Sequence, residues 1–349
     1  MNRTFARSIT IGAALGLLTA GAITPAMAAS PDAGLFGSMD PTYDGVYRQS
    51  LSILALQPLN KVPADAITWL ASQQCLDGAF EGYRNSIRTA CAQPDPAKFT
   101  GADSNSTALG AMALRAVKNN SAADKAIAVL LTKQNKDGGW GYTLGGASDV
   151  NSTGLVLAAL NSSPTTTELS SAGNSARGYL TAAQVPCTAA RTFGLPYQPG
   201  GKADNLASAQ GLVGIAGTLP ADKPTTYASV AKTTCKSSLI NKVATYLSQN
   251  LITSKGRLPS ALDAKQTDWN STAMALIGLA SSQRGKAGIN AGLYQLERNV
   301  IEFTGTGAKF KAAAAANLIM IAGLNGKNPQ AFGSQKSDLV TSLLNSITK

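Results

Sequence analysis

Three copies of a short polar motif are the residues best suited to chemistry. They span residues 103–108 (DSNSTA), 149–154 (DVNSTG) and 268–273 (DWNSTA), and residues 204–209 (DNLASA) are a weaker copy. In all four, the Asp precedes by eleven residues an apolar residue that closes the segment. Each copy gathers a carboxylate and small polar side chains, which in the three full copies include an amide and two hydroxyls. That mixture suits a ligand rich in amide or hydroxyl groups.

A structural role explains part of the motif. Side chains of Asp, Ser and Thr at a helix start accept hydrogen bonds from free backbone N–H groups, and each such cap is worth about 1 kcal/mol. Four aspartates are positioned as caps: Asp103, Asp149, Asp204 and Asp268. A cap needs only one side chain, whereas the motif repeats four polar residues together. Because Asp103 and Thr107 share a helix face and Asn105 points roughly opposite, the amide is available for another role.

If these helices surround a cavity, their first turns gather at one mouth. Tyr47 and Gln49 stand at the Asn and Thr positions of a further segment that lacks the motif. Trp269, inside the third copy, either stacks on a bound ring system or packs at a helix junction. The predicted ligand-binding residues are Tyr47, Gln49, Asp103, Asn105, Thr107, Asp149, Asn151, Thr153, Asp204, Ser208, Asp268, Trp269, Asn270 and Thr272.

The composition excludes several kinds of site. The chain has 349 residues and no histidine, which removes Ser-His-Asp and Cys-His nucleophile systems and imidazole metal sites. We therefore expect no metal and no catalytic residue. The four cysteines allow three disulfide connectivities, and we favour Cys75–Cys91 and Cys187–Cys235 because each closes a loop around one helix junction.

The N-terminus has the pattern of a secretory signal. Arg3 and Arg7 precede an apolar stretch, and residues 25–28 end in a cleavage pattern of small residues. We expect a signal at 1–28, an extended lead-in at 29–42, and no membrane span in an exported, extracellular chain. The formal charge is +11, but the basic residues are scattered. This argues against nucleic acid and favours a basic surface that tolerates anionic cell-wall polymers.

The apolar pattern predicts the elements that position the motifs. Six Ala/Leu/Gly-rich segments without a polar face alternate with six amphipathic ones, near 63–75, 121–135, 170–184, 236–250, 287–303 and 334–348. The first two amphipathic segments end alike, at 74–80 (QCLDGAF) and 134–140 (QNKDGGW). Pairs that cannot cover their own apolar faces close into a ring. We therefore predict an all-α fold, an α6/α6 toroid over residues 43–349 with two disulfides.

These residues resemble a known superfamily. The helix ends at 74–80 and 134–140 are similar to the repeats of squalene and terpene cyclases and of prenyltransferase β subunits. The polar motif resembles the Asp-x-Asp-Asp-Thr-Ala motif of class II terpene cyclases and the inner-helix starts of the transcobalamin and intrinsic-factor group. In the cyclases, the middle Asp donates the proton. Asn105, Asn151 and Asn270 stand there, and an amide cannot deliver a proton.

The resemblance leaves three hypotheses. The first is a secreted, non-catalytic binding protein holding a bulky polar ligand, a corrinoid being the leading candidate, although the β-rich second domain of the transcobalamin group does not fit in this chain. The second is a glycosidase or lyase using the helix-start aspartates; we expect backbone N–H donors to lower their pKa, which leaves the general acid unsupplied. The third is a wall-associated module with a basic outer face.

Overall fold

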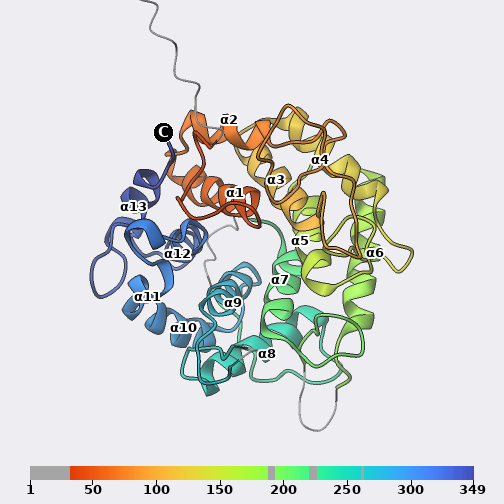
Figure 1. The fold of residues 1–349 in the computed structure, drawn as a ribbon. Coiled ribbons are helices and arrows are strands. Elements are labelled where there is room, and N and C mark those ends of the chain that lie inside the picture. Colours follow the sequence, from red (N-terminus) through yellow and green to blue (C-terminus); the bar gives the residue numbers. More distant parts are fainter. Residues whose placement is uncertain (1–31, 188–192, 220–225, 261–262) are drawn as a thin grey trace, which may run out of the picture.

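The structure is a computed structural model that describes residues 32–187, 193–219, 226–260 and 263–349. In these residues the regular elements are helices, and the extended backbone forms only isolated bridges. Six helices form an inner ring, seen in Figure 1 with the outer helices around it. The inner helices are α1 (Gly45–Leu56), α3 (Ser104–Ala116), α5 (Val150–Asn161), α7 (Asn205–Ala216), α9 (Trp269–Ser281) and α12 (Ala312–Leu324).

The ring is closed. Each inner helix contacts the next, and α12 packs against α1. The outer helices are α2 (Ala64–Ser72), α4 (Asn120–Thr132), α6 (Thr167–Ala183), α8 (Leu239–Thr253), α10 (Lys286–Arg298), α11 (Val300–Thr304) and α13 (Leu339–Asn345). Short 3-10 turns lie at η1 (Gln57–Leu59), η2 (Gly307–Lys309) and η3 (Pro329–Ala331). The predicted α6/α6 toroid is confirmed; the fifth outer segment is split between α10 and α11.

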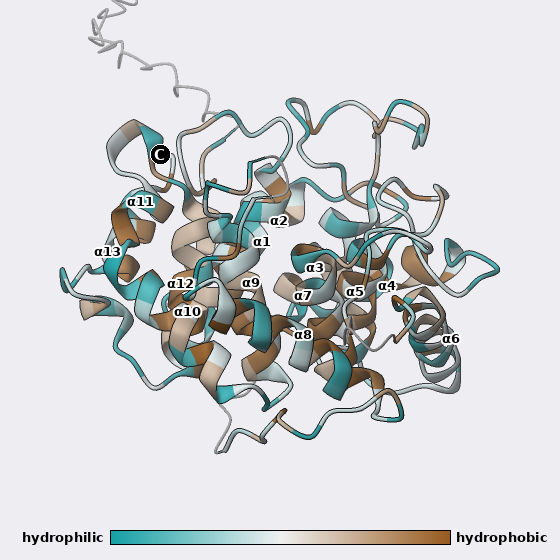
Figure 2. Ribbon diagram, turned by 90° about the horizontal axis from the view of Figure 1, so that it is seen from below, coloured by the Kyte–Doolittle hydropathy of each residue, from teal (hydrophilic) through white to brown (hydrophobic). Residues whose placement is uncertain are grey.

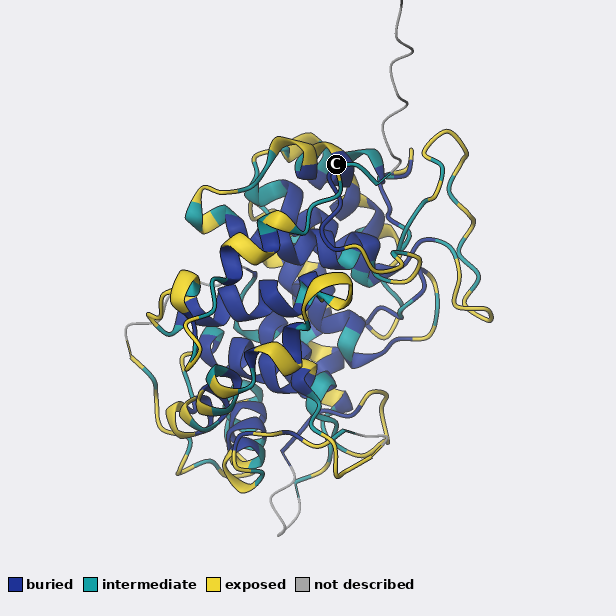
Figure 3. Cartoon of the chain, turned by 60° about the vertical axis from the view of Figure 1, so that its left-hand side comes forward, coloured by how far each residue is buried: buried dark blue, intermediate teal, exposed yellow. Residues whose placement is uncertain are grey.

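The inner helices are buried on nearly all sides. Figure 3 shows them mostly in the buried colour, whereas exposed residues gather on loops and outer helices. In Figure 2 the apolar residues lie mainly on the helices and the polar ones mainly on the connections. Helices α5 and α7 approach closely at two glycines, since a Cβ on Gly154 would lie 2.5 Å from the Gln210 carbonyl oxygen. The absence of a polar face is thus explained by burial against two inner neighbours and one outer helix.

The repeated helix ends at 74–80 and 134–140 link neighbouring outer helices. The side-chain amide of Gln134 donates to the carbonyl oxygens of Gly138 at 2.8 Å and of Ala172, in α6, at 2.9 Å. Gly138 has a φ of +89°, and a Cβ there would lie 2.4 Å from the Ser175 carbonyl oxygen. The Trp140 ring folds back so that its N–H donates to the Leu130 carbonyl. Glycine is therefore needed both for the left-handed turn and for the close approach to α6.

The two chain ends complete the ring. Residues 1–28, the expected signal, lie outside the described residues. Within the expected extended lead-in, the N–H of Gly34 donates to the Thr348 carbonyl, and the Thr348 N–H donates to Leu35. Phe36, 0% exposed, forms a bridge with Ile347. The described part of the lead-in is thus a component of the packed fold, held to the C-terminus.

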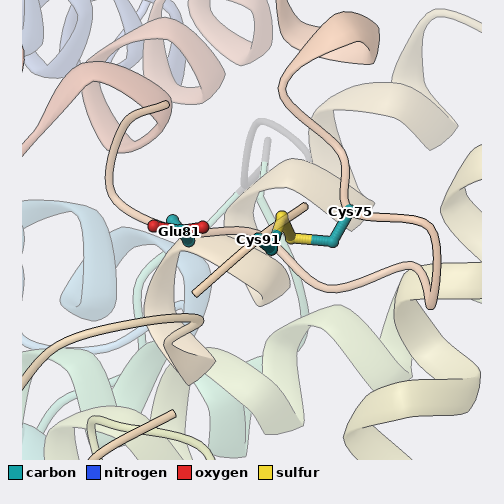
Figure 4. Close-up of side chains that lie close together, drawn as sticks. All are labelled: Cys75, Glu81 and Cys91. Atoms are coloured by element: carbon teal, nitrogen blue, oxygen red, sulfur yellow. A yellow bond between two sulfur atoms is a disulfide. The ribbon is translucent and has the colours of Figure 1, made fainter. Parts of the chain in front are cut away.

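Both favoured disulfides are confirmed. Cys75 is joined to Cys91 and Cys187 to Cys235. Figure 4 shows Glu81 beside the first disulfide. The two sulfurs and a Glu81 oxygen lie within 4.8 Å of one another, but the sulfurs are bonded to each other and so are not thiolate ligands for a metal. Glu81 instead accepts a hydrogen bond from the Ala92 N–H at 2.8 Å and thereby fastens the loop.

No helix within the described ranges is both long enough and apolar enough to cross a bilayer.

Candidate ligand-binding mouth

We use "mouth" for the first turns of the inner helices. Four aspartates cap their helices there, each accepting a hydrogen bond from the third helical residue. The acceptor and donor pairs are Asp103 and Ser106 (2.7 Å), Asp149 and Ser152 (2.8 Å), Asp204 and Ala207 (2.8 Å), and Asp268 and Ser271 (2.9 Å). The caps satisfy donors that every helix start leaves free.

The hydroxyl of the motif holds the preceding loop against its helix. In the second copy, the Thr153 hydroxyl accepts a hydrogen bond from the Trp140 N–H at 3.0 Å, and the Asp149 N–H donates to the Trp140 carbonyl at 2.9 Å. Equivalent bonds recur around the ring, from Phe36 to Gln49, Phe80 to Thr107, Leu195 to Ser208 and Leu258 to Thr272. The structure therefore gives these predicted ligand residues a role in the helix junctions. Gln49, 0% exposed, performs it in place of Thr.

Trp269 packs at a helix junction. Its indole N–H donates to a Glu302 carboxylate oxygen at 3.0 Å, the Arg257 guanidinium lies over the ring at 5.6 Å, and Phe303 contacts it. The side chain is 8% exposed. Of the two alternatives for this ring, the structure shows the packing one.

The helix junctions described above do not use the side chains of the motif asparagines. On α5, the Asn151 Nδ2 donates to Gln210 Oε1 at 2.8 Å, and Gln210 Nε2 donates to the Tyr47 hydroxyl at 3.4 Å. This chain joins α5, α7 and α1, and α1 and α7 lie on opposite sides of the ring. The Asn151 side chain therefore faces the ring axis.

The same bonds correct the expected central cavity. Because Tyr47 and Gln210 meet across the axis, side chains fill the ring at this level. A ligand has to rest on this polar floor rather than enter an open channel. Asn270, in the third copy, is exposed on α9.

Two amide oxygens of the motif have no hydrogen-bond partner among the described residues. They are Oδ1 of Asn105 and Oδ1 of Asn151, and both atoms are buried. Interiors rarely leave such acceptors unpaired, because a buried unpaired polar group costs about 1–3 kcal/mol. A donor from a ligand is one way to satisfy them.

Burial is the main cause of the shifted pKa values at the mouth. It raises the pKa of Asp103 to about 6, against the lowering effect of the hydrogen bonds from Ser106 and Asn105. Burial also raises the pKa of Asp149. The expectation that N–H donors would lower these pKa values was therefore wrong for both residues, since desolvation of the charged form outweighs the hydrogen bonds. Burial raises the pKa of Tyr47 to about 12, so its hydroxyl stays protonated.

Gln210, in the second turn of α7, is a residue on the ring axis that the sequence interpretation missed. It directly follows the weaker copy of the motif, four residues after Leu206, which occupies the Asn position. Residues four apart share a helix face, so Gln210 lies on the same face of α7 as the Asn position of the motif. This spacing could have predicted a polar group on the axis.

Comparison with solved structures supports the fold. A ligand-free variant of the type II terpene cyclase MstE from Scytonema is similar at 12% identity and a TM-score of 0.51, with 84% of this chain and 92% of that chain covered. Another variant of that enzyme, in complex with geranylgeranyl dihydroxybenzoate, matches at 13% identity and a TM-score of 0.50, covering 83% and 92%. No protein-family model matches the sequence, and a search of curated protein sequences found no match.

The chain thus has a terpene cyclase-like α/α toroid fold. An identity this low establishes the fold alone, because one architecture hosts unrelated activities.

Proposed function

We propose that the protein is an exported, non-catalytic binding protein that holds a bulky polar ligand on the floor of the mouth. The observation that carries this proposal is the pair of buried, unpaired amide oxygens of Asn105 and Asn151. The aspartates and threonines of the full motif copies have structural partners, which leaves these amide oxygens for a ligand. Two disulfides and the signal-like N-terminus support export.

The chemistry of the floor favours a ligand that donates hydrogen bonds. The unpaired atoms are acceptors, and the carboxyl groups of Asp103 and Asp149 lie at the same helix starts. A corrinoid, which carries several primary amides, is the leading candidate, and the resemblance of the motif to the transcobalamin group supports it. A glycan is the alternative ligand.

A carbohydrate-active enzyme is the second candidate, and the raised pKa of Asp103 favours it, since a carboxyl with a pKa of about 6 is a usable general acid. Against it, Asp103 is 2% exposed and its Oδ1 caps α3. A catalytic acid has to reach its substrate, so the binding function is the better supported of the two. Loss of a measured glycan cleavage in an Asp149→Asn/Asp204→Asn variant would reverse this choice.

A wall-associated role for the basic surface is a third proposal. Release from isolated cell walls at moderate salt would identify it, because contacts between exposed charges are screened.

The test of the binding function is a panel of purified ligands. The protein is incubated with cyanocobalamin, cobinamide and a hexamer of N-acetylglucosamine, and melting temperature and retained chromophore after gel filtration are measured. We expect one equivalent of a cobamide to be retained and the melting temperature to rise. Absence of any spectral or thermal change with the cobamides would refute corrinoid binding, and absence with the whole panel would refute the function.

A matched pair of variants locates the ligand. Asn105→Leu removes an unpaired oxygen at the floor and should weaken binding about tenfold or more, which corresponds to about 1.4 kcal/mol. Asn270→Leu makes the same change at the exposed asparagine of the third copy and should leave the affinity unchanged. Equal losses in both variants would place the ligand elsewhere.

A further inference from the structure

An exposed aromatic side chain lines a hollow on the outer wall of the ring. Tyr294, on α10, is 55% exposed, and the hollow beside it has a volume of about 380 Å³. Its walls are the end of α10 and the segment 327–334, which connects α12 to α13. Helices α10 and α13 lie on the same outer side of the ring (Figure 1). The described residues that line the hollow include none from the first turns of the inner helices, so this hollow is separate from the mouth.

The connecting segment is fastened to α10. The Ser334 N–H donates to the Glu297 carbonyl at 2.8 Å. Gly333 has a φ of +73°, and a Cβ there would clash with the same carbonyl oxygen. The Lys327 ammonium forms an ion pair with the Glu297 carboxylate at 3.0 Å. The two walls are therefore held together without a ligand, which lowers the entropic cost of binding in the hollow.

One cation of the hollow has no acidic partner. The Arg298 guanidinium lies over the Tyr294 ring, 5.0 Å from its centroid, and within the described ranges its side chain forms no hydrogen bond or ion pair. The other charged residues of the lining, Glu297 and Lys327, are paired with each other. Because a stacked guanidinium keeps its N–H groups at the edge of its plane, Arg298 can still bind a carboxylate through two parallel hydrogen bonds.

Neutral polar groups complete the lining. Asn328 is exposed, and its Oδ1 accepts a hydrogen bond from the Gln330 N–H at 2.9 Å, which leaves its amide N–H groups as donors. The exposed Ser334 hydroxyl donates weakly to the Glu297 carbonyl, at 3.4 Å, and its oxygen can accept a hydrogen bond. An amide donor and a hydroxyl acceptor are suited to the hydroxyl groups of a sugar.

The combination matches the parts of an acidic sugar. A pyranose ring has an apolar face of C–H groups, and Tyr294 offers a flat apolar surface with a polar edge. A uronic acid adds a carboxylate, for which Arg298 is the free partner. A simple aromatic acid would use the ring and the cation but would leave the Asn328 amide without a partner. Tyrosine and arginine are also the residue types that most often supply the energy of an interface.

We propose that Tyr294, Arg298, Asn328 and Ser334 form a surface site for a carboxylated sugar unit of an acidic polysaccharide. The sugar ring stacks on Tyr294, and its carboxylate binds Arg298. The site does not depend on the ligand proposed for the mouth, and it would give the contact with anionic cell-wall polymers a defined place on the outer wall of the ring.

The first test is titration calorimetry of the full mature chain with trigalacturonate. Two matched probes are its fully methyl-esterified form, which keeps the rings but loses the charge, and triglutamate, which keeps the carboxylates but has no sugar. We expect trigalacturonate to bind at least about tenfold more tightly than either. Equal binding of the ester or of triglutamate, or no binding of trigalacturonate, would refute the site.

The second test uses variants of exposed residues. Tyr294→Ala and Arg298→Gln should each weaken trigalacturonate binding about tenfold, whereas Tyr294→Trp should retain it. Lys336→Gln is the matched control, because it removes the same charge from an exposed residue of the same segment that does not line the hollow. Equal losses in Arg298→Gln and Lys336→Gln would mean that the general positive field attracts the probe, and would overturn the proposal. Thermal melting by circular dichroism checks that each variant is folded.

Failure of this site and failure of the proposed function are distinguishable. Tyr294→Ala should retain a cobamide to the same extent as the unmodified protein, since the hollow is separate from the mouth. A protein that retains a cobamide but does not bind trigalacturonate would keep the binding function and lose the sugar site, and the opposite result would reject the mouth ligand alone.

Discussion

Replacement of a single motif hydroxyl tests the structural half of the account. In Thr153→Val the Trp140 N–H, now 3.0 Å from the threonine hydroxyl, loses its acceptor. Trp140 is 1% exposed, so water does not replace the bond. A buried unpaired donor costs about 2 kcal/mol. For a single domain of about 320 residues, that loss corresponds to a decrease of roughly 3 °C in melting temperature, which differential scanning calorimetry measures.

The matched control is Thr68→Val. The Thr68 side chain is exposed on α2, and its hydroxyl donates to the Ala64 carbonyl one turn earlier. Surface changes of this kind shift the free energy of unfolding by less than about 0.5 kcal/mol. If Thr153→Val unfolds at the same temperature as Thr68→Val, the Thr153 hydroxyl does not stabilise the contact between the Trp140 loop and α5. The motif threonines would then again be candidate ligand-binding residues.

Further predictions concern the disulfide, the helix contact and the buried carboxyl. Serine at Cys75 and Cys91 should lower the stability by about 3 kcal/mol, measured by urea unfolding, because the 16-residue loop is no longer closed. Gly154→Ala should destabilise the ring, since its Cβ would lie 2.5 Å from a carbonyl oxygen of α7, whereas Gly178→Ala, with open space around it, should stabilise by about 0.5–1 kcal/mol. Asp103 has a folded pKa of about 6, above its ordinary 3.8, so its contribution to stability is present below pH 4 and is lost as the pH rises through 6. Asp103→Asn, which can still cap the helix, should therefore gain stability relative to the unmodified protein over this range in calorimetry, and a constant difference between the two would contradict the raised pKa.

The fold follows closely from the sequence because its signals are local. Apolar composition and the repeated polar motif predict each inner helix, and the residues chosen as helix starts agree with α3, α5, α7 and α9 to within one position. Of the three possible cysteine pairings, the one favoured from loop closure is the one that the structure contains. The fifth outer segment was less well predicted: Asn299 separates α10 from α11. Helix ends of this kind depend on tertiary packing, which sequence patterns do not contain.

The site was less predictable because the motif combines two roles in one run of residues. From the sequence alone, Thr107, Thr153 and Thr272 are as good candidates for ligand binding as the asparagines. In the structure, their hydroxyls instead accept hydrogen bonds from backbone N–H groups of the preceding loops. The distinction depends on which backbone N–H each hydroxyl meets, and those partners lie 13–27 residues away. The Tyr47–Gln210 contact, between residues 163 positions apart, depends on closure of the ring.

The electrostatic expectation failed for a similar reason. Helix-start aspartates are commonly half-exposed, and their N–H bonds then lower the pKa. Asp103 and Asp149 are instead 2% and 1% exposed, because the loops that follow the outer helices cover them. How far these loops bury the aspartates depends on the assembled toroid, so the sequence pattern did not predict it.

The most direct test of the central claim is equilibrium dialysis of cyanocobalamin and cobinamide against the purified mature chain and its Asn105→Leu/Asn151→Leu variant. We expect one bound equivalent for the unmodified protein and at least a tenfold weaker affinity for the variant, with calorimetry showing that the variant remains folded. Equal affinities, or no bound cobamide on the unmodified protein, would contradict the claim that the side-chain amides of Asn105 and Asn151 hold a corrinoid.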